Sequence, residues 1–97
     1  MTFRELVRQR WEVVKDCNVI GRDCPTHIDA RRRLLTARFD YDDAATWMRR
    51  AVDWKFAGDA GAVVRCVRRA RYAVRKGRAH EAFVVGGGVP ALYPTPE

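Results

Sequence analysis

Three cysteines and two histidines are the residues of this chain that could ligate a metal ion. Cys17, Cys24 and His27 have the spacing C-x6-C-x2-H, and Cys66 and His80 lie elsewhere in the chain. Thiolate and imidazole suit tetrahedral zinc, but structural zinc sites usually contain two cysteines separated by two to four residues, a pair that this chain lacks. Cys17 and Cys66 also fall among the apolar positions of predicted helices, where cysteine packs as a small hydrophobic residue. The sequence therefore predicts neither a metal site nor a cofactor.

Covalent and acid–base catalysis find little support in the sequence. The chain contains no serine, and its two histidines lie near the ends of predicted helices. Nucleophilic catalysis needs a nucleophile beside a base and an orienting group. Asp40, Asp42 and Asp43 are paired carboxylates, but capping and the helix dipole explain acidic residues at a helix start. The glycines at 86–88 lack the Lys-Ser/Thr that completes a phosphate-binding loop. We therefore expect no enzymatic activity.

Positive charge is concentrated between Ala62 and Arg78, where seven lysine and arginine residues occur and no carboxylate does. On a helical wheel, six of them surround a tyrosine on one face, and the opposite face is apolar. The predicted binding face consists of Arg65, Arg68, Arg69, Arg71, Tyr72, Arg75 and Lys76. Guanidinium groups recognise both phosphate and carboxylate oxygens, so this face predicts an anionic partner without fixing its kind.

Two further groups are secondary candidates for binding that partner: a short basic run and a pair of tryptophans with an arginine between them. Their members are Arg31, Arg32, Arg33, Trp47, Arg50 and Trp54. A basic run of this length is more typical of a solvated helix face than of a binding site. The two indoles either fill a helical bundle or, if exposed, form an aromatic platform for bases or for a protein partner.

The overall charge supports a binding function. The chain has 97 residues, with 19 lysines and arginines against 12 aspartates and glutamates, for a net charge of +7. Residues 1–59 contribute +2 and residues 60–97 contribute +5. We expect binding to DNA or RNA through phosphates. The alternative is a protein-interaction module, such as a regulator, an inhibitor or an assembly subunit, that docks on an acidic protein surface. The sequence also leaves open that the chain forms a homo-oligomer.

The compartment is inferred from three features. No apolar run approaches the roughly 18 residues of a membrane span. The first ten residues lack the apolar core of a signal peptide. An odd number of cysteines argues against a disulfide scaffold. We therefore expect a cytoplasmic protein with no membrane partner.

Cap signals and apolar periodicity predict an all-α fold. Thr2 and Glu5 form a capping box, Gly58 ends one helix, Asp59 caps the next, and Gly77 ends that one. The predicted helices span residues 2–18, 26–38, 41–57 and 59–77 and form a small four-helix bundle. The first and last of these helices each have a clear apolar face, and we expect these faces to pack into the core of the bundle.

The third predicted helix carries the longest apolar stripe. Its members are Tyr41, Ala44, Ala45, Met48, Ala51, Val52 and Phe56, and we expect them to face the core. After residue 80 the chain contains a run of glycines and several prolines, which break regular structure. The sequence thus predicts a helical domain over 1–80 and an extended tail over 81–97, which either packs on the bundle or contacts a partner.

Overall fold

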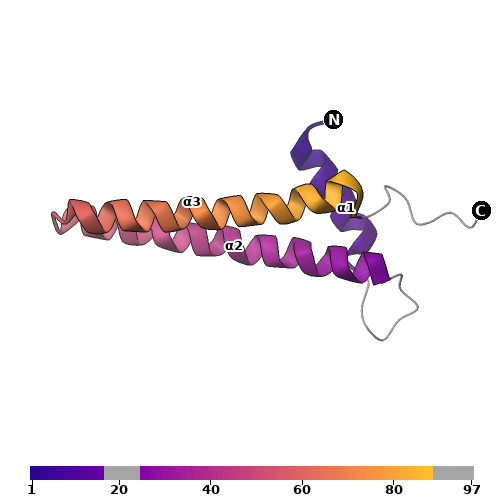
Figure 1. Cartoon of the computed structure of the whole chain (residues 1–97), viewed down its shortest axis with the longest axis horizontal. Coiled ribbons are helices and arrows are strands. Elements are labelled where there is room, and N and C mark those ends of the chain that lie inside the picture. The colour runs from indigo at the N-terminus through magenta and orange to yellow at the C-terminus, as the bar shows by residue number, and fades with distance from the viewer. Residues whose placement is uncertain (17–24, 89–97) are drawn as a thin grey trace, which may run out of the picture.

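The computed structural model describes residues 1–16 and 25–88, which contain three α-helices and one short π-helical turn. Helix α1 spans Phe3–Val14, α2 spans Pro25–Phe56, α3 spans Ala60–Phe83, and the π-helical turn spans Val84–Gly88. The long helices α2 and α3 form an antiparallel hairpin, and α1 crosses the end of this hairpin that is remote from its turn (Figure 1). The molecule is elongated, with extents of 62 × 31 × 14 Å.

The predicted all-α class is confirmed, but the predicted four-helix bundle is wrong. The expected helices 26–38 and 41–57 are one continuous helix, α2. No glycine or proline occurs between residues 26 and 57, and an aspartate inside a helix costs only up to about 0.7 kcal/mol relative to alanine. Asp40, Asp42 and Asp43 therefore lie within α2 instead of capping a new helix. Asp40 has a partner on α3, because its Oδ1 lies 3.5 Å from Lys76 Nζ.

The ends of α1 and α3 also differ from the prediction. Helix α1 ends at Val14, and α3 continues past Gly77 to Phe83, so the first residues of the expected tail are helical. Gly77 is a packing residue: a Cβ at this position would lie 3.0 Å from the ring of Tyr41 and 3.3 Å from the carbonyl oxygen of Ala37. Residues 89–97 lie outside the described residues, and the division of the chain at residue 80 stays a prediction.

The caps predicted at the first helix and at the turn are confirmed. The hydroxyl oxygen of Thr2 accepts the N–H of Glu5 at 3.2 Å. Gly58 has a φ of 79°, in the left-handed region that glycine adopts without steric cost. The N–H of Asp59 donates to the carbonyl of Trp54 at 3.0 Å, and the Asp59 carboxylate accepts the N–H three residues later at 2.9 Å. Asp59 thus both ends α2 and caps α3.

Small residues form the contact between α2 and α3. In α2 the buried alanines recur every seven residues, which is the repeat of a coiled coil. The buried small residues are Ala30, Ala37, Ala44 and Ala51 on α2, and Ala62, Cys66, Ala70, Ala73 and Gly77 on α3. Small side chains let two helices approach closely. They also bury little apolar area, so this contact stabilises the hairpin less per residue than a leucine seam does.

Larger side chains are buried where α1 crosses the hairpin. Val14, Leu34 and Val84 form a core there with Ala30, and side chains of α1 pack against it. The hydroxyl of Tyr41 on α2 donates to the buried carboxylate of Glu81 on α3. We call this end of the molecule the base (residues 1–16, 25–41 and 79–88) and the remaining two-helix part the arm (residues 42–78).

The apolar stripe predicted for residues 41–56 is only partly buried. Ala44 and Ala51 lie in the contact with α3, but Met48, Val52 and Phe56 are 46%, 50% and 88% exposed. A four-helix bundle would cover these side chains, whereas the described part of the chain provides no third helix over the arm. The arm therefore presents apolar side chains to solvent.

Candidate functional site

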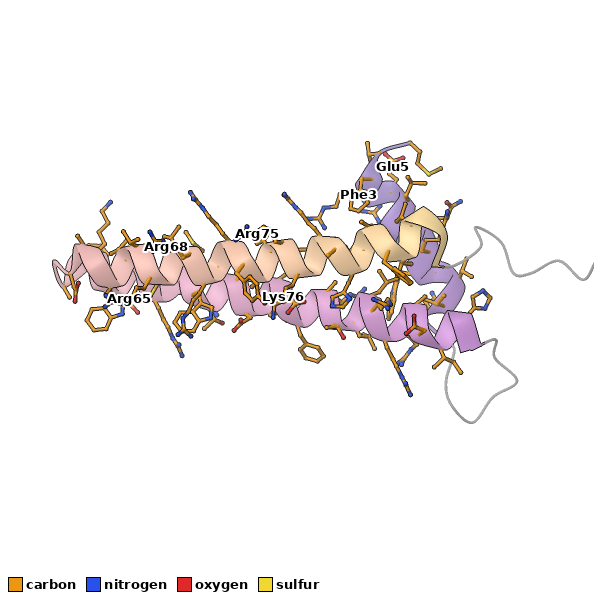
Figure 2. All side chains as sticks on the ribbon, viewed as in Figure 1. Phe3, Glu5, Arg65, Arg68, Arg75 and Lys76 are labelled. Carbon is orange, nitrogen blue, oxygen red and sulfur yellow. The ribbon has the colours of Figure 1, made fainter. Side chains whose placement is uncertain are left out.

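The basic residues of α3 point in different directions. Arg68 and Arg75 project from the edge of α3 that faces away from α2, and Arg65 and Lys76 lie on the side of α3 toward α2 (Figure 2). Side chains three or four residues apart are neighbours on a helix surface. Such spacing joins Arg68, Arg71, Arg75 and Arg78, which we call the arginine row. At 1.5 Å per residue the row is about 15 Å long.

Within the described residues, the four guanidinium groups of the arginine row have no ion pair, hydrogen bond or ring contact, and Arg78 alone among them interacts electrostatically with Tyr41. All four side chains are exposed. The ion pairs and ring contacts in residues 1–16 and 25–88 involve other basic residues. Like charges at this spacing repel by a few tenths of a kcal/mol per pair. An external anion would remove this repulsion, so the row is suited to binding one.

Two other members of the predicted face already have partners on the hairpin. The Nζ of Lys76 lies 3.5 Å from Asp40 Oδ1 and 5.0 Å from the ring centre of Tyr72, which is largely exposed. The guanidinium of Arg69 lies 4.7 Å from the ring centre of Trp47. The ion pair of Lys76 with Asp40 and the ring contact of Arg69 join α3 to α2. The contact of Lys76 with Tyr72 lies within α3. Arg69 and Lys76 therefore contribute to the hairpin contact as well as to its charge.

The two tryptophans differ in exposure but line the same hollow near the turn, together with Arg65 and Arg69. Trp47 is half-buried, and the guanidinium of Arg50 also lies over its ring, at 4.6 Å. Trp54 is 45% exposed. Trp47 thus contributes both to the contact between the helices and to this hollow, whereas Trp54 and Arg65 are the more accessible to a partner.

The basic run at residues 31–33 lies at the base, away from the arginine row. The Nε of Arg31 donates to a backbone carbonyl just after α1 at 3.0 Å. Arg33 pairs with Asp29 at 3.0 Å, and its guanidinium lies 3.8 Å from the ring centre of Phe83. Arg32 is exposed. Two of the three arginines therefore have structural partners within the molecule.

Arg78 belongs to the arginine row but is absent from the face predicted from the sequence. The prediction ended the basic helix at Gly77, so Arg78 was treated as a residue beyond it. Its spacing from Arg71 and Arg75 is the signal that identifies it, because a residue three positions after Arg75 lies on the same helix face.

An open groove of about 580 Å³ lies beside the arginine row, between α2 and α3. Its floor is apolar and consists of Ala44, Ala45, Met48, Ala70 and Val74. Three members of the row, Arg71, Arg75 and Arg78, form its rim. None of the residues that line the groove carries a carboxylate. The groove therefore combines an apolar lining with guanidinium groups, as the hollow lined by Trp54 and Arg65 also does.

Two side chains at the base have raised pKa values: the hydrogen bond to Glu12 raises the pKa of Lys15, and the pKa of Tyr41 is raised further. Burial, together with the hydrogen bond to Glu81, raises the pKa of Tyr41 to about 12. The Tyr41 hydroxyl therefore stays protonated at neutral pH and remains a hydrogen-bond donor. The pair of Tyr41 and Glu81 joins α2 to α3, and no set of three metal-ligating side chains includes Glu81 within the described residues.

The metal and membrane predictions concern residues that the structure describes only in part. Cys17 and Cys24 lie outside the described residues, and in residues 1–16 and 25–88 no three His, Cys, Asp or Glu side chains converge on a possible metal position. Cys66 is a free thiol, buried in the contact between α2 and α3. Among the described helices, none is long and apolar enough to span a bilayer.

No family model, curated protein or solved structure matches this chain. Function is therefore inferred from the geometry of the chain itself. The arginine row and the apolar groove beside it are two surfaces that have the composition of binding sites.

Proposed function

We propose that this chain is a non-catalytic binding protein that holds DNA or RNA by the phosphate backbone through the arginine row. The observation that carries this proposal is that the four guanidinium groups have no ion pair or ring contact within the described residues. In α3 the only carboxylate is that of Glu81, which is buried and bonded to Tyr41. An exposed cationic row without internal counterions attracts a polyanion.

The length of the row suits a phosphate backbone. Duplex DNA carries one negative charge per roughly 1.7 Å of its axis, so a row about 15 Å long meets several phosphates. Contacts to phosphates give affinity and orientation but do not read the base sequence. We therefore expect affinity for nucleic acid with little sequence preference.

Salt dependence of binding tests this proposal. Fluorescence anisotropy with a labelled duplex of roughly 20 base pairs should show an affinity that falls steeply as salt rises. The Arg68→Gln variant removes one unpaired guanidinium and should lower the log–log slope by about 0.9. Arg33→Gln is the matched control, because Arg33 is already paired with Asp29 and stacked on Phe83. It should leave the slope unchanged.

Two results would contradict the nucleic-acid proposal. One is the absence of measurable binding to duplex and single-stranded nucleic acid at low salt. The other is an equal loss of slope in the Arg33→Gln and Arg68→Gln variants, because binding would then follow net charge and not the arginine row.

A second function, docking on an acidic protein surface, is supported by the groove. Phosphate binding does not require an apolar floor, but the floor of Ala45, Met48 and Val74 beside the rim arginines is apolar. Protein interfaces combine buried apolar contacts with charged groups at the rim.

A further inference from the structure

One face of the hairpin is covered at the base and uncovered in the arm. Leu34, Tyr41 and Met48 are seven residues apart on α2, so their side chains lie on the same face. Leu34 is 3% exposed, Tyr41 is half-buried and Met48 is 46% exposed. Exposure along this one face therefore rises from the base to the arm.

Helix α1 is what covers this face at the base. Val7 and Trp11 of α1 pack against the core that contains Leu34, and they line a hollow together with Leu34 and Tyr41. A second hollow is lined by Tyr41, Arg78 and Glu81 with residues of α1, and it adjoins the groove because Arg78 lines both. The groove is thus the continuation of a surface that already binds one amphipathic helix.

We infer that the groove binds an amphipathic helix of a partner protein, with an apolar stripe flanked by glutamates or aspartates. This inference rests on the second function proposed above and is independent of nucleic-acid binding. The apolar stripe would contact the floor at Met48 and Val74, as α1 contacts the base. Its acidic residues would meet the rim guanidinium groups, for which the lining provides no carboxylate.

Charge argues for an acidic partner helix over a second copy of this chain. The chain has a net charge of +7. Packing two grooves face to face would bring Arg71, Arg75 and Arg78 of both copies near one another. Like charges that approach in this way are unfavourable, whereas an acidic helix supplies the complementary charge.

A synthetic peptide tests the inference directly. The probe is a helical peptide of roughly 18 residues with leucines at i, i+3, i+4 and i+7 and glutamates beside them. Its control has the same composition, but its leucines are spread around the helix. Isothermal titration calorimetry should show that the patterned peptide binds at least roughly tenfold more tightly than the control, because only the patterned peptide has an apolar face.

Two variants of the chain locate the binding site. The double variant Ala45→Gln with Met48→Gln places two polar side chains in the groove floor. It should lower the affinity for the patterned peptide at least roughly tenfold. Both positions are exposed and glutamine is a good helix former, so circular dichroism should be unchanged. Arg68→Gln should leave peptide affinity unchanged, because Arg68 does not line the groove.

Several outcomes would overturn the inference. Equal binding of the two peptides would mean that charge alone is recognised. Unchanged affinity in the double variant would place the peptide elsewhere. Failure of the peptide to bind, with dimerisation of the wild-type chain that the double variant loses, would assign the groove to a second copy. Failure of the peptide to bind, with loss of duplex binding in the double variant, would assign the groove to nucleic acid.

One outcome supports the inference: the double variant loses peptide binding but retains duplex binding. This result also leaves the nucleic-acid proposal intact.

Discussion

The base and the arm consist of the same two long helices, but different side chains hold them together. At the base, Val14, Leu34 and Val84 from three elements form a core of branched side chains. In the arm, the buried cluster consists of alanines, with Trp47 and Val74 packed at its edge. The comparison indicates that burial of large side chains at the base stabilises the chain, while the arm keeps its large side chains available for contact.

The charges of the two regions differ in the same way. At the base, Arg33 is paired with Asp29, and the guanidinium of Arg38 lies 4.3 Å from the ring centre of Trp11. In the arm, arginines of the row have no ion pair or ring contact among the described residues. Arg33 and Arg38 at the base are therefore engaged within the molecule, whereas the arginine row is left for a ligand.

Truncating one large side chain in each region should give the largest difference in stability between the base and the arm. Leu34→Ala removes a buried side chain at the base and should lower the free energy of unfolding by about 3 kcal/mol. Met48→Ala removes a half-exposed side chain of the arm and should change it by less than about 0.5 kcal/mol. Urea unfolding followed by circular dichroism measures both. Equal destabilisation by the two variants would show that the arm has a core of its own.

Glycine replacement compares the boundary of the base with the tip of the arm. In Gly77→Ala, the new Cβ would lie 3.0 Å from the ring of Tyr41, so the ring must shift. Overpacking costs about 1–3 kcal/mol and exceeds the gain in helix propensity of about 1 kcal/mol, so we expect a net loss of about 1 kcal/mol. Gly61→Ala, whose Cβ would have only ordinary contacts, should gain up to about 1 kcal/mol. Urea unfolding should give opposite signs, and a gain for both variants would contradict the close packing at Gly77.

Alkaline pH should lower the free energy of unfolding through Tyr41. The pKa of Tyr41 is about 12 in the folded chain, against an ordinary value of 10.0. Between these values the unfolded chain releases its tyrosine proton and the folded chain retains it, so the stability of the fold falls as pH rises from 10.0 toward 12. The urea midpoint should therefore decline across this range, and it should decline less in Tyr41→Phe. The same decline in both proteins would contradict a special role for the pair of Tyr41 and Glu81.

Local sequence signals predicted the features that depend on neighbouring residues. The cap at Thr2 and the turn at Gly58 and Asp59 follow from hydrogen bonds within a few residues, and the structure contains them. Asp40, Asp42 and Asp43 misled the prediction because acidic residues favour a helix start but do not prevent a helix from continuing. Gly77 misled it because a helix stop and a close contact both call for glycine.

Exposure of the arm could not be predicted from the sequence. The stripe that contains Met48 and Phe56 has the period of a buried helix face. Whether such a face is buried depends on the number of helices around it, and that number was overestimated when α2 was divided in two. The arginine row was predicted in part: periodicity placed Arg68, Arg71 and Arg75 on one face, but Arg78 required the true end of α3.

Chemical-shift mapping with duplex DNA tests most directly whether the arm is the binding region. Amide signals of the isotope-labelled chain are followed while a duplex of roughly 20 base pairs is added at low salt. We predict that the largest shifts follow the arginine row, over residues 68–78, and that amides near Val14, Leu34 and Val84 are unchanged. Shifts centred on the base, or the absence of shifts, would contradict this account.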